Sequence, residues 1–531
     1  MTTEYLIEMA GADPASGKAV AAYFSGNGFV TLPTDTPPNT YYAQRVKVPG
    51  NYERALFGAG TTSGDISVGV GLIELSNMDG KLDYLRDLAF DGYPLRILSV
   101  AKLNARHDNA RYDAAVLVFS GTVDQVELQW DRATIRIRDR LAELAKPFQT
   151  VTYAGTTVSG GRAEAEGKPE DLKGQRKPTL WGAPAQVPGV LSNPYDLIYD
   201  LGENGFAGVT EVRDKGVLLT ATGRDYPTTA ALIAATVPSG QYATCKAKGQ
   251  IGLGLAPLGQ ISAAPIEVGG EVAQAHSRTA AQVAGRMLWR MGLVEGVSFL
   301  ASDIATLDAL NAAPVGYWTG TDEVTALDSV AAVLGSIGAM ITPDRLGVFR
   351  MLRFGAPVTE PEVTLTATEI LETASGRGFQ LLATGDEGKG VPAWKVTVKY
   401  ARNWAVQTRN DLQTATSDAF KSFAELEWRL AVADAPHVKA IHRLAPELTF
   451  ETYLINEADA LAEAKRRLAL HSVKRDRLRV PVKSSLVQQI DLGDVVRVKV
   501  NRFGLDKGKS FVVIGLVEDL QTGVSTLDLW G

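Results

Sequence analysis

The chain has 531 residues, too many for one hydrophobic core, and this length indicates three or four domains. Its 54 basic and 60 acidic residues give a net charge of -6, so the basic excess that grips nucleic-acid phosphates is absent and no specific nucleic-acid binding is expected. With 45% hydrophobic and 21% charged residues, the composition is ordinary for a globular protein.

Residues 1–155 are expected to form a β-rich domain. Short apolar runs occur at 95–101 and 115–121. Ile135 and Ile137 alternate with Arg136 and Arg138, which predicts a strand with one face on a core and the other in water. A short helix is expected around residues 82–88, after the turn at Asp79-Gly80.

The composition of residues 156–177 differs from that of the preceding domain, because apolar residues are nearly absent and Gly, Glu, Lys and Arg dominate. We predict a flexible loop or linker there. Residues 178–270 follow as a second β-rich domain, in which Asp214-Lys215-Gly216 is the expected turn of a hairpin.

Residues 271–390 shift to a helical period and predict an α+β domain. Thr279 and Gln282 fit a capping box that begins a helix. Its apolar face is expected to carry Val283, Met287 and Met291. A second helix is expected to begin at Thr325, and a hairpin should follow over residues 339–352.

Residues 391–531 predict a C-terminal β-barrel-like domain with one helix. A half-buried strand is expected at 394–400, and Asn456 can cap a helix that runs to about His471. The packing side of that helix should carry Leu461, Ala464, Leu468 and Ala469. Strands at 494–501, 510–520 and 523–529 have short joins and should form a meander at the edge of a small barrel.

The predicted fold class is therefore mainly β with an α+β insertion. It is multidomain, with small β-barrel domains and a helix-containing middle domain.

The one cysteine, Cys245, excludes an intramolecular disulfide and favours folding in a reducing cytoplasm, where a buried small hydrophobe is the expected role. Glu4 and Glu8 stand where a signal peptide needs basic residues, so no export signal is expected. The uncharged stretches 226–245 and 249–266 contain Pro and Gly, so no membrane span is predicted.

The chain offers weak candidates for chemistry. The histidines are His107, His276, His437, His442 and His471, and no Cys or HExxH pattern accompanies them, so surface or capping roles are expected. Gly249, Gly252 and Gly254 lack the Walker lysine and favour a strand where backbones approach closely. No Gly-x-Ser-x-Gly elbow occurs.

Two charged features have alternative interpretations. Asp491 and Asp494 could form an acid–base pair, but they flank Leu492-Gly493 before a strand, where turn carboxylates are usual. The run 465–479 holds seven Lys or Arg and one Asp. It indicates either a patch for DNA or an acidic partner, or a solvated helix face followed by a strand with alternating arginines. No catalytic residue, cofactor or metal site is predicted.

Several segments resemble the tail hub proteins at the tail tip or baseplate of long-tailed bacteriophages. At the C-terminus they are 490–498 (IDLGDVVRV), 502–505 (RFGL), 511–515 (FVVIG) and 526–531 (TLDLWG), with the helix 457–470 before them. In the middle they are 177–182 (KPTLWG), 207–216 (AGVTEVRDKG) and 242–245 (YATC). Near the start they are 41–49 (YYAQRVKVP) and 71–83 (GLIELSNMDGKLD).

The resemblance implies a virion structural protein that forms a homotrimeric ring of tail-tube-like β-barrels, closes the tail tube and acts as a conduit for DNA ejection. Implied partners are the tail tube or distal tail protein, the tape-measure protein and receptor-binding or fibre proteins. The implied location is the virion tail tip, after synthesis in the host bacterial cytoplasm. The rival hypotheses are a receptor-binding or fibre-attachment tail protein and a tail-associated cell-wall hydrolase.

Overall fold

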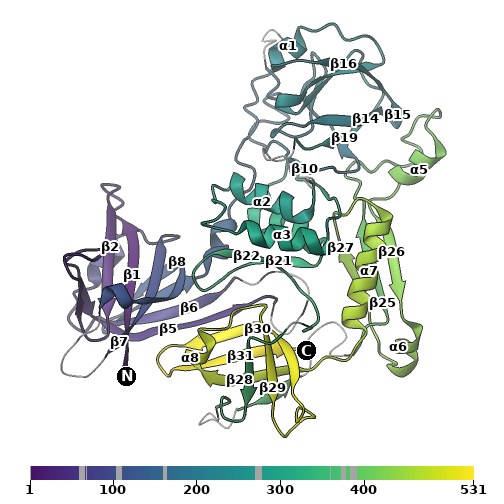
Figure 1. Ribbon diagram of the computed structural model, residues 1–531. Helices are drawn as coiled ribbons and strands as arrows, with labels where there is room; N and C mark the ends of the chain where they lie inside the picture. Colours follow the sequence, from purple (N-terminus) through teal and green to yellow (C-terminus); the bar gives the residue numbers. More distant parts are fainter. Residues whose placement is uncertain are drawn as a thin grey trace.

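The computed structural model describes residues 2–58, 62, 66, 68–102, 111–159, 164–268, 278–358, 360–371, 378–382 and 391–531. His107 and His276 lie outside the described residues. The fold is mainly β, as predicted. Figure 1 shows an N-terminal sheet, a separate upper β unit, a central group of helices, a side arm of strands with one long helix, and a C-terminal group of strands.

One large sheet contains strands from both ends of the chain. Its order is β24-β28-β31-β30-β5-β6-β9-β8-β7-β1-β2-β4-β3, and β29 joins β30 to β23. The N-terminal strands are β1 (Thr2–Ala12), β2 (Ala19–Ser25), β3 (Phe29–Val30), β4 (Tyr41–Gln44), β5 (Val46–Ala55), β6 (Val70–Ser76), β7 (Pro94–Lys102), β8 (Val116–Leu128) and β9 (Arg132–Arg138). The others are β23 (Val363–Thr366), β24 (Gln380–Leu382), β28 (Arg477–Lys483), β29 (Val495–Lys499), β30 (Lys509–Asp519) and β31 (Val524–Trp530).

Strand β30 joins the two ends of the chain. Its residues 509–512 pair with β29, and its residues 515–519 pair with β5 along the same edge, while β31 occupies the other edge. Among the described strands no sheet closes on itself, because the path is open at β24 and β3. The small β-barrel domains expected from the sequence are not closed barrels in this part of the chain, and β30 pairs with β5 in addition to the strands of its own meander.

The N-terminal sheet confirms the predicted alternation. Ile135 and Ile137 are buried, whereas Arg136 and Arg138 are exposed. The short helix expected at 82–88 is a 3-10 turn over Asp83–Asp87.

The upper unit contains β10 (Leu180–Gly182), β11 (Val187–Pro188), β12 (Val190–Asn193), β13 (Ile198–Asp200), β14 (Gly208–Asp214), β15 (Val217–Leu218), β16 (Thr220–Asp225), α1 (Thr229–Ile233), β17 (Gln241–Cys245), β18 (Gln250–Leu253) and β19 (Ile261–Ile266). The predicted hairpin turn is confirmed between β14 and β15. Lys215 and Gly216 both have positive φ, 50° and 88°, the conformation that a two-residue hairpin requires. Cys245 is buried, as expected.

The segment predicted as a linker makes specific contacts with this unit. The Gly167 backbone N–H donates a hydrogen bond of 2.7 Å to the Ser192 carbonyl, and the Asn193 amide donates one of 3.0 Å to the Glu164 carbonyl. Within the segment, Lys177 forms a 2.6 Å ion pair with Glu166. Thr157 and Ala165 are buried.

Backbones approach closely at the glycine stretch of β18, as predicted. A Cβ at Gly249 would lie 1.7 Å from the Gly202 carbonyl oxygen, and one at Gly254 would lie 2.0 Å from the Pro238 carbonyl oxygen. Only glycine fits these contacts, so the pattern is explained by packing.

The middle of the chain holds α2 (Ala280–Arg290), α3 (Ala301–Leu310), β20 (Gly316–Trp318), α4 (Ala326–Gly335) and the hairpin β21 (Ala339–Pro343) with β22 (Phe349–Arg353). The predicted caps at Thr279 and Thr325 are confirmed, because their hydroxyls accept backbone hydrogen bonds at the starts of α2 and α4. The predicted cap at Asn456 is wrong in part: Asn456 precedes the helix Glu457–His471, but its side chain makes no capping hydrogen bond. In a capping box the Gln282 side chain would bond back to the Thr279 backbone. Here the Gln282 amide donates a hydrogen bond to Asp308 instead.

The arm consists of β25 (Lys395–Tyr400), α5 (Asp418–Ala424), β26 (Arg429–Asp434), α6 (Pro436–Ile441), β27 (Glu447–Glu451) and α7 (Glu457–His471). Helix α8 (Ser484–Val487) follows β28. Val396, Val398 and Ala464 share one hydrophobic core with α2 and α4. No helix within the described ranges combines the length and apolar character that a membrane span requires.

The expected packing side of α7 is partly wrong. Ala464 is buried, but Ala469 is exposed and the buried face includes Glu463 and Arg467. Apolar periodicity does not identify charged residues that are buried as ion pairs.

Candidate functional site: a charged junction between three parts of the chain

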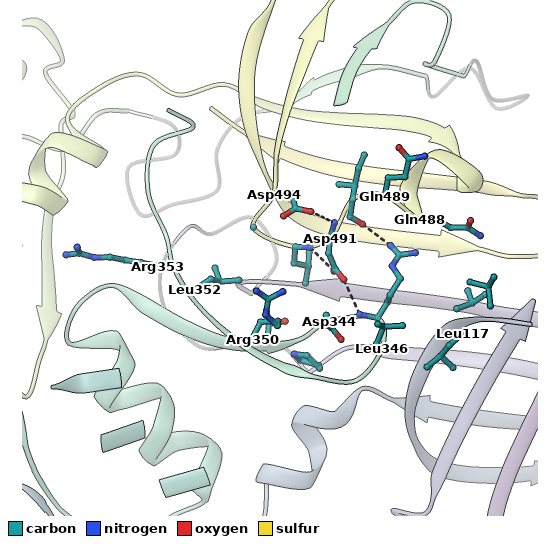
Figure 2. Close-up of a pocket in the computed structure, with 18 residues that line it drawn as sticks. Leu117, Asp344, Leu346, Arg350, Leu352, Arg353, Gln488, Gln489, Asp491 and Asp494 are labelled. Carbon is teal, nitrogen blue, oxygen red and sulfur yellow. Dashed lines mark hydrogen bonds between the residues drawn. The ribbon is translucent and has the colours of Figure 1, made fainter. Parts of the chain in front are cut away.

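A cleft of about 500 Å³ lies where the N-terminal sheet, the β21–β22 hairpin and the loop before β29 meet. Its walls are residues 116–118 of β8, hairpin residues 342–346 with Arg350, Leu352 and Arg353, and loop residues 488–494. Figure 2 shows the hairpin residues Asp344 and Arg350 on one side of this cleft and the loop residues Asp491 and Asp494 above them.

Arg54 of β5 connects the N-terminal sheet to this region. Its side chain is only 2% exposed, and its Nη2 lies 2.8 Å from Asp491 Oδ1. Its Nη1 donates a 3.1 Å hydrogen bond to the Pro343 carbonyl at the end of β21. Burial lowers the pKa of Arg54, but the carboxylates of Asp491 and Glu518 outweigh it and the pKa is raised. This one side chain therefore contacts all three parts of the chain.

Arg345 makes the complementary contacts from the hairpin turn. Its backbone N–H donates to Asp491 Oδ2 at 3.0 Å, and its Nη2 donates to the carbonyls of Val487 and Ile490. The same Nη2 lies 3.4 Å from Oε1 of Glu518, a β30 side chain with 1% exposure. Burial raises the pKa of Glu518, and both arginines oppose that shift.

We name Arg54, Arg345, Asp491 and Glu518 the junction cluster. Its two guanidinium groups balance two carboxylates, so it presents no net charge to a ligand. Arg54 Nε, Arg345 Nη1 and Glu518 Oε1 have no hydrogen-bond partner among the described residues. Removing any single member would leave a buried charge uncompensated.

The two carboxylates singled out from the sequence are turn carboxylates, as expected. Asp494 accepts a 2.7 Å hydrogen bond from the Asp491 backbone, and Asp491 accepts one of 2.8 Å from the Leu492 backbone. Burial, with nearby Asp491 and Glu362, raises the pKa of Asp494. The cleft lining has no His, Cys or Ser. The described part of the chain contains no group of three or more His, Cys, Asp or Glu side chains placed to hold a metal ion.

A second charge cluster connects α7 to β22. Glu463, 1% exposed, accepts hydrogen bonds of 2.7–2.8 Å from Arg353, Arg466 and Arg467. Arg353 belongs to β22, which also lines the junction cleft. Burial raises the pKa of Glu463, but the three arginines outweigh it and the pKa is lowered.

The basic run at 465–479 is largely occupied by internal ion pairs. Arg466 and Arg467 bind Glu463, while Arg477 and Arg479 bind Asp528 of β31. Asp476 pairs with Lys509 at 2.7 Å. Lys465 and Lys474 are exposed. Most of the cations are therefore committed to the fold instead of forming an open patch.

A third buried carboxylate lies in the upper unit. Asp200 accepts hydrogen bonds from the hydroxyls of Tyr153 and Ser192, both at 2.8 Å, and from the Gln250 amide at 2.9 Å. Burial raises its pKa to about 6. Tyr153 precedes the predicted linker, so this network ties the start of that segment to β13.

No protein-family model matches the sequence, and no curated protein matches it. Among solved structures, the chain is similar to a tail protein from Neisseria meningitidis MC58 with 10% identity and a TM-score of 0.42, covering 99% of this chain and 96% of that one. A 43 kDa tail protein of prophage MuSo2 from Shewanella oneidensis gives 10% identity, a TM-score of 0.40, and coverage of 99% and 96%. A prophage tail protein, gp18, from Listeria monocytogenes EGD-e gives 8% identity and a TM-score of 0.38, covering 99% of this chain and 94% of that one. Scores and identities this low carry no inference about function.

Of the junction cluster, only Asp491 was singled out from the sequence. A signal for Arg54 was present, since Tyr52 and Arg54 of β5 and Leu56 just after it alternate in the sequence, and all three are buried. An arginine on the apolar face of a strand indicates a buried ion pair. Nothing in the sequence indicates which carboxylate meets it.

Proposed function

We propose that the chain is a virion structural protein, the central hub of a bacteriophage tail tip or baseplate. One observation carries the proposal: segments that resemble tail hubs, taken from opposite ends of the sequence, are neighbours in one sheet. Residues 41–49 run from β4 into β5, residues 71–83 include most of β6, and residues 511–515 belong to β30. Their order in the sheet is β30-β5-β6.

A continuous sheet suits a component that bears load. Backbone hydrogen bonds between β5 and β30 connect the first and last parts of the chain without a hinge. The junction cluster and the Glu463 cluster add ion pairs near the β21–β22 hairpin, Arg54 with Asp491 and Arg353 with Glu463. This construction supports a framework that keeps the tail tube closed until ejection, more than one whose parts open around a substrate.

The charge pattern supports a conduit for DNA. The net charge is -6, and most cations of the basic run at 465–479 form ion pairs with Glu463 or Asp528. A protein with this net charge lacks the basic excess that would retain passing DNA through its phosphates. In this proposal three copies form a closed ring at the tail tip, in contact with the tail tube or distal tail protein, the tape-measure protein, and receptor-binding or fibre proteins.

Mass photometry of the purified full-length chain tests the ring. We expect a species of about 170 kDa, three times the 56.8 kDa chain. A purely monomeric protein that is also absent from the tail axis would overturn the proposal. Zymography on bacterial cell walls is the companion test, because a clear lytic band would support a hydrolase instead.

A further inference from the structure

The outer end of the arm is formed by α6 and the segment that leads from it to β27. In Figure 1 α6 lies at the lower end of the arm, below the labels of β25 and β26. Val438 is buried and anchors the helix, and Pro436 at the helix start fixes its direction. We call residues 436–444 the arm tip.

The arm tip exposes two large aliphatic side chains. Ile441 is 73% exposed and Leu444 is 83% exposed, three positions apart in the sequence. Exposed aliphatic residues are ordinary on protein surfaces, but this pair is more exposed than Leu255 and Leu258, another pair three positions apart, which are 59% and 71% exposed.

Cations flank this aliphatic pair. Lys439 and Arg443 are exposed, and neither forms an ion pair with a described residue. The Lys439 ammonium lies 4.0 Å from the ring centroid of Trp394, at the base of the tip. Glu447, the nearest acidic residue after the tip in sequence, is engaged by Lys395 at 3.0 Å. Residues 436–444 thus hold two cations and no acidic residue beside the aliphatic pair, and Asp434, two residues before the tip, is an exposed carboxylate.

We propose that the arm tip docks onto an anionic lipid surface. Ile441 and Leu444 enter the boundary between headgroups and acyl chains, while Lys439 and Arg443 lie over the lipid phosphates. A lipid surface fits this shape better than a protein partner does. Stable protein interfaces bury about 800 Å² on each side, whereas two side chains on a projecting turn suffice for shallow insertion. The proposal does not depend on the hub function, since it requires only that the tip be accessible.

Vesicle flotation with the full-length protein tests this proposal. Vesicles of phosphatidylcholine alone are compared with vesicles that also contain phosphatidylglycerol. We expect binding to the anionic vesicles only, and we expect it to weaken as salt is added. The double variant Ile441→Ser/Leu444→Ser should bind at least about tenfold more weakly. Lys439→Ser/Arg443→Ser should lose about thirtyfold, since each cation near the surface contributes about 1 kcal/mol.

The matched control is Leu255→Ser/Leu258→Ser, which removes two aliphatic side chains, 59% and 71% exposed, from a loop of the upper unit. It should bind vesicles like the unaltered protein. Unchanged circular dichroism and unfolding midpoints would establish that the arm-tip variants are folded. Quenching of tryptophan fluorescence by brominated lipid adds a local readout, which Trp394→Phe should diminish.

Three outcomes would overturn the proposal. The first is no flotation with anionic vesicles. The second is flotation that the aliphatic double variant leaves unchanged. In the third, polyglutamate binds as tightly as the vesicles and only the Lys439/Arg443 variant weakens that binding, which would assign the tip to an acidic protein partner.

Discussion

Arg54 and Asp491 form a buried ion pair with Nη2 and Oδ1 2.8 Å apart, although one lies in β5 and the other in the loop before β29. The hairpin joins them, because Arg54 donates to the Pro343 carbonyl and Asp491 accepts the Arg345 backbone N–H. A contact among three distant segments forms only when each is already in place, so it reports on the assembly of the whole fold.

Replacing Arg54 with Met should lower the free energy of unfolding by about 3–5 kcal/mol, because Asp491 loses its ion-pair partner and Arg345 alone then faces two carboxylates. Urea unfolding followed by tryptophan fluorescence measures this. The control is Arg86→Met, whose side chain is 76% exposed and pairs with Asp87 on the surface; its effect should stay below about 1 kcal/mol. The double variant Arg54→Met/Glu518→Met should recover part of the loss. Equal stability of Arg54→Met and the unaltered protein would contradict the role of the cluster.

Glu463→Gln should be similarly costly, at about 3–5 kcal/mol, because three arginines lose the carboxylate that they share. Glu457→Gln on the same helix is the matched control. It is exposed in the first turn and should cost at most about 1 kcal/mol through the helix dipole. Thermal unfolding of both variants at one pH and salt concentration provides the comparison, and matching midpoints would refute the prediction.

Asp200→Asn should change the pH dependence of stability. Because the folded pKa of Asp200, about 6, lies above its ordinary value, this group contributes stability that is fully present below about pH 4 and is lost as the pH rises through 6. The Asn variant lacks this loss. Relative to the unaltered protein, it should gain about 3 kcal/mol between pH 4 and pH 8.

Denaturant unfolding of both proteins across this pH range measures the difference. Glu170→Gln, an exposed carboxylate just before the predicted linker ends, is the control and should show no comparable trend. A stability difference between Asp200→Asn and the unaltered protein that does not vary with pH would show that Asp200 titrates normally.

Gly254→Ala should destabilise the upper unit, because its Cβ would lie 2.0 Å from the Pro238 carbonyl oxygen and the backbone must move. We expect a loss of about 1–3 kcal/mol. Gly208→Ala is the matched control, since a Cβ there meets nothing within 4 Å and its φ is not positive. Hydrogen exchange of the β17–β18 amides localises the effect, and protection that is the same in both variants would count against it.

Local features of the fold could be predicted from the sequence. The helix starts at Thr279 and Thr325, the turn at Lys215-Gly216, and the alternation of Ile135 and Ile137 all follow from interactions within a few residues. Each such feature depends on local backbone geometry or on one face of one strand, and a sequence records both directly.

Long-range pairing could not be predicted in the same way. The apolar pattern of β30 fits a meander, and it says nothing about β5 as a further neighbour on the same edge. Likewise, Asp491 was visible as a turn residue, but its partner Arg54 lies at the other end of the chain. Hydrophobic periodicity ranks Glu463 and Arg467 as surface residues, whereas mutual neutralisation lets them be buried.

The most direct test of the hub proposal is electron cryomicroscopy of assembled tails that carry this chain, reconstructed without imposed symmetry. We predict three copies around the tail axis at the distal end of the tube, with the β30–β5 sheet fitting the density as one body. Density for this chain at the periphery of the tail, or a single copy off the axis, would contradict it.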